Sequence, residues 1–216
     1  MVLKVFFYGM AIALAAAFIE IAILQTINFL AGTDTMEDYS FLVFVLYNFL
    51  GIAFVEEYIK YFVVKKSVLK NSAFDEPVDA QLYMIISALG FAALENILIL
   101  FPIEKNLLFS QIMQSALITT GLRFVGATFL HALCSGTLGF FLALSICQPK
   151  NKIKLLFYGL FLSTVLHGLY NFSIIKMFDT EKIGFLLIPI IILISLAIFT
   201  LYGFRKLNKI KGACQV

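Results

Sequence analysis

Long apolar stretches separated by short polar segments run along almost the whole chain. They cover about residues 5–30, 41–64, 80–101, 155–175 and 183–204, and a further stretch runs from 111 to 147. A membrane helix needs about 20 mostly apolar residues, so each of the shorter stretches predicts one crossing. The stretches lack the alternating pattern of a membrane β-strand. The pattern therefore predicts an all-α, polytopic helical membrane protein.

The stretch at residues 111–147 is too long for one ordinary crossing and too short for two. We interpret residues 111–121 as an interfacial helix or a tilted extension, with the crossing beginning near Arg123. The chain then has about six crossings. We expect one transmembrane domain over residues 1–216, with a core at about 41–175 and flanking helices at 5–30 and 183–204.

Composition supports this class. Hydrophobic residues make up 62% of the chain and charged residues 13%, whereas soluble proteins average roughly 25% charged residues. No polar segment is long enough to fold as a second domain, and no basic tract suggests binding of nucleic acid. We therefore expect the protein to have a lipid bilayer as its partner and to bind no nucleic acid.

The loop charges predict the orientation of the crossings. With the N-terminus inside, the outer side holds only Lys105, Lys176 and Lys182. The inner side holds a larger set: Lys4, Lys65, Lys66, Lys70, Lys150, Lys152, Lys154, Arg205, Lys206, Lys209 and Lys211. This excess agrees with the positive-inside rule, so we predict cytoplasmic N- and C-termini in a cell membrane.

Ionisable residues stand out inside the apolar stretches. One ionised side chain at the centre of a membrane helix costs about 2.5–3.5 kcal/mol. The residues concerned are Glu20, Glu56, Glu57, Lys60, Glu95, His131 and His167. At a rise of 1.5 Å per residue, the glutamates and histidines of the second to fifth crossings lie roughly 13–24 Å from the inner edge. These crossings thus offer their polar groups in one layer.

Each group also has a structural interpretation. Lys60 follows the two glutamates at i,i+3 and i,i+4, the spacing of an ion pair within one helix. A histidine in a membrane helix is commonly a hydrogen-bonding residue between helices. Glu20 could pair with Arg123, and we rank that role ahead of a chemical one. The combination of the residues, more than any one of them, indicates function.

The combination suits activation of water. A carboxylate in low-dielectric surroundings can act as a general base near neutrality, and a second carboxylate can hold the proton and deliver it to a leaving amine. Neutral histidines ligate a metal or donate a hydrogen bond to an oxyanion. Two histidines and a glutamate also match catalytic zinc and leave one glutamate as base. The cofactor is therefore either none or a divalent metal such as zinc.

A serine or cysteine nucleophile is not expected. Cys134 and Ser135 follow His131, but adjacent helical positions face different directions. The two neighbouring glutamates also point about 100° apart on a helix, so both need not face the histidines. We assign Glu56 as the base, and Glu57 as its proton partner or as the group paired with Lys60.

Four ordered motifs resemble those of the PrsW family of intramembrane proteases. They are Glu56-Glu57-x-x-Lys60, the segment Gly90-Phe91-Ala92-Ala93-Leu94-Glu95-Asn96, the segment His131-Ala132-Leu133-Cys134-Ser135-Gly136, and His167-Gly168-Leu169-Tyr170-Asn171. The resemblance spans roughly residues 52–172. It extends distantly to the CAAX prenyl protease type II (CPBP/Abi) superfamily, whose F-x-x-x-H motif has Glu95 in place of its histidine here, as in PrsW members.

The resemblance implies an intramembrane endopeptidase of the prokaryotic cytoplasmic membrane. Its substrates would be membrane proteins or peptides, since PrsW itself acts on single-pass anti-sigma factors. Glu56 and Glu57 would activate water, and Asn171 would bind the oxyanion or orient water. Glu95, His131 and His167 would complete the site and, if a metal is present, hold it.

Two other classes of function stay open. One is a small proton-coupled transporter whose buried carboxylates titrate, although the core lacks the helix pairs broken by Gly and Pro that are typical of carriers. The other is a membrane protein without catalysis, such as an immunity or adaptor protein. The leading prediction is hydrolysis of peptide bonds by water that glutamate and histidine activate.

Overall fold

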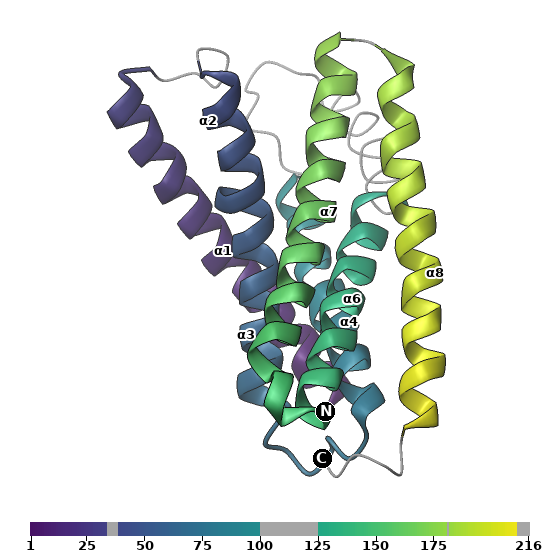
Figure 1. Cartoon of the computed structure of the whole chain (residues 1–216). Helices are drawn as coiled ribbons and strands as arrows, with labels where there is room; N and C mark the ends of the chain where they lie inside the picture. Colours follow the sequence, from purple (N-terminus) through teal and green to yellow (C-terminus); the bar gives the residue numbers. More distant parts are fainter. Residues whose placement is uncertain (34–38, 100–124, 181, 211–216) are drawn as a thin grey trace, which may run out of the picture.

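The computed structural model describes residues 1–33, 39–99, 125–180 and 182–210, and within them the chain is helical (Figure 1). The elements are α1 (Val2–Ala31), α2 (Phe41–Leu46), η2 (Tyr47–Phe54), α3 (Val55–Ser67), α4 (Pro77–Ile99), α6 (Ala127–Cys147), η3 (Pro149–Asn151), α7 (Lys152–Thr180), η4 (Ile183–Leu186) and α8 (Leu187–Lys209). The segment η2 is a π-helix, and η3 and η4 are 3₁₀-helices. The predicted all-α class is confirmed.

In the described part of the chain, 6 helices are long and apolar enough to cross a membrane, as predicted. The elements α2, η2 and α3 form one of these crossings, Phe41–Ser67. The fourth crossing, expected to begin near Arg123, has its helix α6 from Ala127. Arg123 itself and the predicted interfacial helix at residues 111–121 lie outside the described residues. The division into a core and flanking helices stays a prediction.

The helix α6 lies at the centre of the bundle. It packs against α4, α7 and α8, and α4 packs on its other side against α1. Its residues from Leu130 to Phe140 are all buried. Small residues permit this packing, because a Cβ on Gly139 of α6 would lie only 2.6 Å from the Cα of Gln81 in α4. The central helix is therefore surrounded by protein over most of its length, which suits a helix that carries a site.

Two glycines hold α1 and α4 in backbone contact. A Cβ on Gly9 of α1 would meet the carbonyl oxygen of Ser87, and a Cβ on Gly90 of α4 would meet the carbonyl oxygen of Phe6. Small residues at helix crossings in membranes let the backbones approach in this way. Beyond this crossing Ala13 and Ala16 of α1 pack with Phe91 of α4 in a small apolar cluster.

Replacing Gly90 by alanine should separate α1 from α4. The added methyl group meets backbone atoms, which cannot rotate away, so we expect a loss of about 1–3 kcal/mol of stability. Gly184→Ala is the matched control, because a Cβ there meets no atom within 4 Å. Thermal unfolding of both variants in detergent measures the difference. Equal melting temperatures for the two variants would show that the contact contributes nothing.

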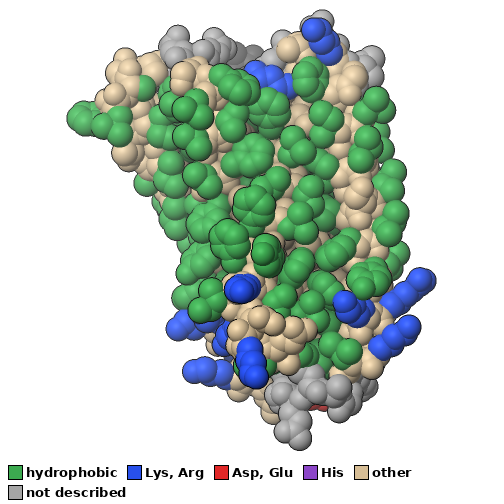
Figure 2. Space-filling view, in the orientation of Figure 1, with side chains coloured by type: hydrophobic (Ala, Val, Ile, Leu, Met, Phe, Trp, Pro, Cys, Tyr) green, Lys and Arg blue, Asp and Glu red, His purple; other side chains and the backbone are tan. Residues whose placement is uncertain are grey.

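The surface agrees with a lipid environment. In Figure 2 hydrophobic side chains cover most of the visible face, and most of the visible Lys and Arg side chains lie near one end. The N-terminal end of α1 and the C-terminal end of α8 lie together at that end (Figure 1). Exposed aliphatic residues line α8, among them Leu187, Ile191, Ile194, Ile198 and Leu201. The predicted cytoplasmic location of the termini stays a prediction.

Candidate functional site

The polar residues of the second crossing follow directly after the π-helix η2. Such helices are rare and occur frequently at functional sites. In α3 the buried residues are Glu56, Glu57, Lys60, Val63 and Val64, which lie on one face. Both adjacent glutamates therefore face the interior of the bundle. The sequence alone did not require both glutamates to face the histidines. In the structure both of them do.

Lys60 joins the two glutamates of α3. Its Nζ lies 2.9 Å from Oε1 of Glu57 and 3.2 Å from Oε2 of Glu56. Lys60 and Glu57 are fully buried, and Glu56 is 5% exposed. Buried charges are tolerated when they are paired and hydrogen-bonded. The pairing of Glu57 with Lys60, one of the two roles predicted for this glutamate, is observed.

The helix α6 contributes His131, which lies between α3 and α4. Its Nδ1 is 2.8 Å from Nζ of Lys60, and its Nε2 is 2.7 Å from Oε2 of Glu95 in α4. Because an ammonium group only donates hydrogen bonds, Nδ1 of His131 accepts and Nε2 carries the proton given to Glu95. The hydrogen bonds thus fix both the tautomer and the orientation of this ring.

The helix α7 contributes His167. Its Nδ1 lies 3.0 Å from Oε1 of Glu57, and its ring meets that of His131 edge to face, with centroids 5.0 Å apart. The next residue, Gly168, lets the second crossing approach α7, because a Cβ there would lie 2.7 Å from the Phe49 ring of η2. His167 therefore supplies the functional side chain, and Gly168 leaves the space that lets the second crossing approach α7.

Ser135 corrects one expectation from the sequence. It was set aside because adjacent helical positions face different directions, but it follows His131 by four residues and so shares its face. Its hydroxyl donates a hydrogen bond of 2.9 Å to Oε2 of Glu57. Glu57 thus accepts hydrogen bonds on both oxygens, from Ser135 and from Lys60 and His167. Ser135 therefore supports the carboxylate of Glu57, and the expectation that no serine acts as a nucleophile stays a prediction.

Three residues present donor atoms that could hold a metal. Atoms of Glu56, His131 and His167 all lie within 4.8 Å of one another. Oε2 of Glu56 is 3.5 Å from Nδ1 of His131 and 3.8 Å from Nε2 of His167. Metal–ligand bonds of 2.0–2.1 Å in a tetrahedral site separate the ligand atoms by about 3.4 Å. Two histidines and one carboxylate at nearly this spacing fit a catalytic metal.

The opposite nitrogen of each histidine bonds a carboxylate, Glu95 for His131 and Glu57 for His167. Such partners orient metal-binding histidines in known sites. The geometry therefore favours Glu56 as the third donor and gives Glu95 a supporting position. The sequence had suggested Glu95, His131 and His167 as the ligand set, and that set stays a prediction.

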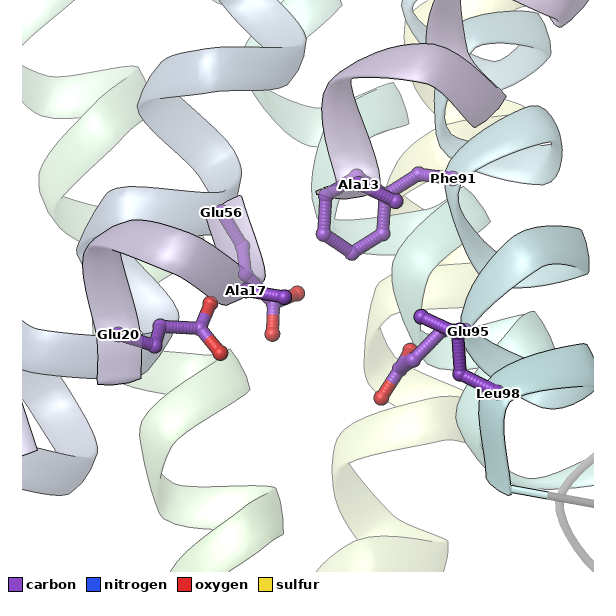
Figure 3. Close-up of a pocket in the computed structure, with 7 residues that line it drawn as sticks. All are labelled: Ala13, Ala17, Glu20, Glu56, Phe91, Glu95 and Leu98. Atoms are coloured by element: carbon purple, nitrogen blue, oxygen red, sulfur yellow. The ribbon is translucent and has the colours of Figure 1, made fainter. Parts of the chain in front are cut away.

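A cavity of about 50 Å³ opens beside the cluster, between α1, α3 and α4 (Figure 3). Its lining consists of Ala13, Ala17, Glu20, Glu56, Phe91, Glu95 and Leu98. Figure 3 shows the carboxylates of Glu20, Glu56 and Glu95 directed into this space. A polar cavity needs only about 10–15 Å³ to hold a water molecule. The cavity can therefore supply water to Glu56.

Two further residues singled out in the sequence, Glu20 and Asn171, lie outside the cluster of donor atoms. Glu20, expected to pair with Arg123, lines the cavity, whereas Arg123 lies outside the described residues. Asn171 lies in α7 one turn after His167 and is half-buried. Its predicted role at the oxyanion stays a prediction. The cavity position of Glu20 was missed because the sequence does not tell which face of α1 meets α4.

Comparisons of the sequence with known proteins lead to one family of proteases. The model of a family described as PrsW family intramembrane metalloprotease matches residues 1–200. The chain is 29% identical to Protease PrsW of Oceanobacillus iheyensis, covering 97% of this chain and 84% of that protein. It is 31% identical to Protease PrsW of Bacillus subtilis, with coverages of 80% and 68%.

Protease PrsW of Clostridioides difficile is 28% identical over 74% of this chain, and the match covers 63% of that protein. The chain thus spans less than two thirds of this relative's length. No solved structure matches the chain.

Proposed function

Because this chain belongs to the PrsW family of intramembrane metalloproteases, we propose that it hydrolyses peptide bonds of membrane-associated proteins at the cluster around Glu56. The family, together with the 6 apolar helices in the described part of the chain, makes it a multi-pass protein of the bacterial cytoplasmic membrane. Its substrate is a segment of another membrane protein. Single-pass proteins, such as those resembling anti-sigma factors, are the substrate class that we favour.

One observation carries the proposal. Glu56 belongs both to the buried cluster with Lys60 and the two histidines and to the lining of the cavity. Glu57 does not line the cavity, and both of its oxygens accept hydrogen bonds from the cluster. Of the two adjacent glutamates, Glu56 is therefore the one with access to water, which a general base requires.

The hydrolytic step follows from this position. The oxygen of a water molecule in the cavity forms a bond to the carbonyl carbon of the substrate while one of its protons passes to Glu56. The C–N bond then breaks, and a proton passes to the nitrogen, which leaves as an amine. The other product is a carboxylic acid, so water and peptide account for all atoms. Nζ of Lys60 lies 3.2 Å from Oε2 of Glu56 and holds the orientation of this carboxylate.

A divalent metal fits the same residues. Held by Glu56, His131 and His167, it would act as a Lewis acid that polarises the peptide carbonyl. Glu95 and Glu57 would then keep the two rings in the orientation that ligation needs. In that form of the site Glu20 and Glu95 are the carboxylates that face the cavity and can take the proton.

Cleavage by the purified chain tests the proposal. The full-length protein is reconstituted in liposomes with a single-pass substrate tagged at both ends. We expect two fragments that together account for the substrate, and none from liposomes that lack the protein. An intact substrate beside a folded protein would favour the adaptor alternative. Proton flux without cleavage would favour the transporter.

A further inference from the structure

The ammonium group of Lys60 lies among the atoms that would bind a metal. Its Nζ is 2.8 Å from Nδ1 of His131 and 3.2 Å from Oε2 of Glu56. These two atoms belong to the three donors of the candidate metal site, since the same Oε2 is 3.5 Å from Nδ1. The group also lies 4.3 Å from the centre of the Phe91 ring, and the side chain is fully buried.

The lone pair of Nδ1 can serve only one partner. Lys60 has no acceptor, so Nδ1 of His131 must accept its proton in the observed arrangement. A neutral histidine ligates a metal through the same kind of unprotonated nitrogen. A metal and an ammonium group would also repel each other as like charges at close range. Binding of a metal therefore requires Lys60 to leave Nδ1 and Glu56.

Lys60 has other partners that would remain after such a movement. Oε1 of Glu57, at 2.9 Å, is not among the candidate donors of the metal site, and the ring of Phe91 offers a cation–π contact. With these partners the buried ammonium group stays paired after the movement. The large cost of an unpaired buried charge is therefore avoided. The displacement is thus a local change of partner and needs no movement of a helix.

We propose that Lys60 is a built-in competitor for the metal site and sets its affinity for divalent cations. The side chain occupies two of the three donors when no metal is bound, and a metal displaces it towards Glu57. The proposal builds on the metal site of the proposed function, but it concerns binding and does not depend on proteolysis.

Metal titration of purified, chelator-treated full-length protein tests this proposal. Co²⁺ is followed by its visible absorption bands, and Zn²⁺ by competition with Co²⁺. We expect Lys60→Met to bind both ions at least about 10-fold more tightly than the wild type, a change of the size that partners of metal ligands cause. Adding His131→Ala to Lys60→Met should remove this gain, because it removes a ligand.

Lys65→Met is the matched control. It removes the same charge from the same helix, but Lys65 is exposed and faces the ring of Tyr61. We expect its affinity to stay within about twofold of the wild type, since exposed charges are largely screened. Lys60→Gln, which keeps a hydrogen-bond donor for Glu57, provides a second variant if Lys60→Met does not fold.

Unchanged or weaker binding by the Lys60 variants would overturn the proposal, as would equal tightening by Lys65→Met. If the wild type cleaves its substrate but the Lys60 variants bind metal no more tightly than the wild type, this inference is wrong and the proposed function stands. A protein that binds metal as expected but cleaves nothing defeats the proposed function alone.

Discussion

Glu56→Gln should slow cleavage strongly while the protein stays folded. The amide cannot accept the proton of the attacking water, and loss of a general base costs about 10²–10⁴-fold in rate. Lys60 keeps its ion pair with Glu57, at 2.9 Å, so the buried ammonium remains paired. We therefore expect kcat to fall by this factor with little change in KM or in melting temperature. Initial rates on the tagged substrate in liposomes measure the effect.

Asp75→Asn is the control for this variant. It makes the same change from a carboxylate to an amide, at an exposed residue outside the cluster. Its rate should match that of the wild type. Cleavage by Glu56→Gln within about twofold of the Asp75→Asn rate would remove Glu56 from the chemistry, because loss of a base must exceed this difference.

Glu57→Gln should act first on stability. Its carboxylate accepts hydrogen bonds from Lys60 at 2.9 Å, His167 at 3.0 Å and Ser135 at 2.9 Å. An amide turns one acceptor into a donor and removes the nearer of the two charges paired with Lys60, leaving the one of Glu56 at 3.2 Å. Breaking a buried ion pair on one side costs about 3–5 kcal/mol. For a protein of this size that corresponds to a drop of roughly 6–20 °C in melting temperature.

Two further variants identify the cause of the loss. Ser135→Ala removes one hydrogen bond to the same carboxylate and should cost less, about 1.5–3 kcal/mol. The double variant Glu57→Gln with Lys60→Met should lose less than the sum of the single changes, because both charges of the pair are then absent. Additive losses, or a larger loss from Ser135→Ala, would contradict the role assigned to Glu57.

The crossings were predictable because they depend on a local property of the chain. A run of about 20 apolar residues predicts a membrane helix wherever it occurs, and the structure has 6 such helices in its described part. The ionisable residues were equally visible, because charged side chains such as Glu56, Glu57 and Lys60 stand out in an apolar helix. The family predicted from their motifs is confirmed by the match over residues 1–200.

The partners of each residue were less predictable, since they depend on how the helices rotate against one another. The π-helix η2 precedes the paired glutamates, and nothing in the apolar pattern marks it. The approach of η2 to α7 at Gly168 and of α1 to α4 at Gly90 depends on contacts distant in sequence. This explains why Glu95 was expected as a ligand although the geometry favours Glu56.

Ser135 is a different case, because its position could have been inferred. It lies four residues after His131, and this spacing puts both on one face of α6. The hydrogen bond to Glu57 follows once that face is known to meet α3. Comparing i and i+4 positions around each candidate residue would have found it.

The most direct test is to map the bond that the protein cuts. Wild-type protein in liposomes is incubated with a single-pass substrate in H₂¹⁸O, and the fragments are analysed by mass spectrometry. The account predicts a cut inside the membrane-spanning segment and one ¹⁸O atom in the new carboxyl group. No such fragment should form with Glu56→Gln. Cuts confined to the parts outside the membrane, or an identical pattern from Glu56→Gln, would contradict it.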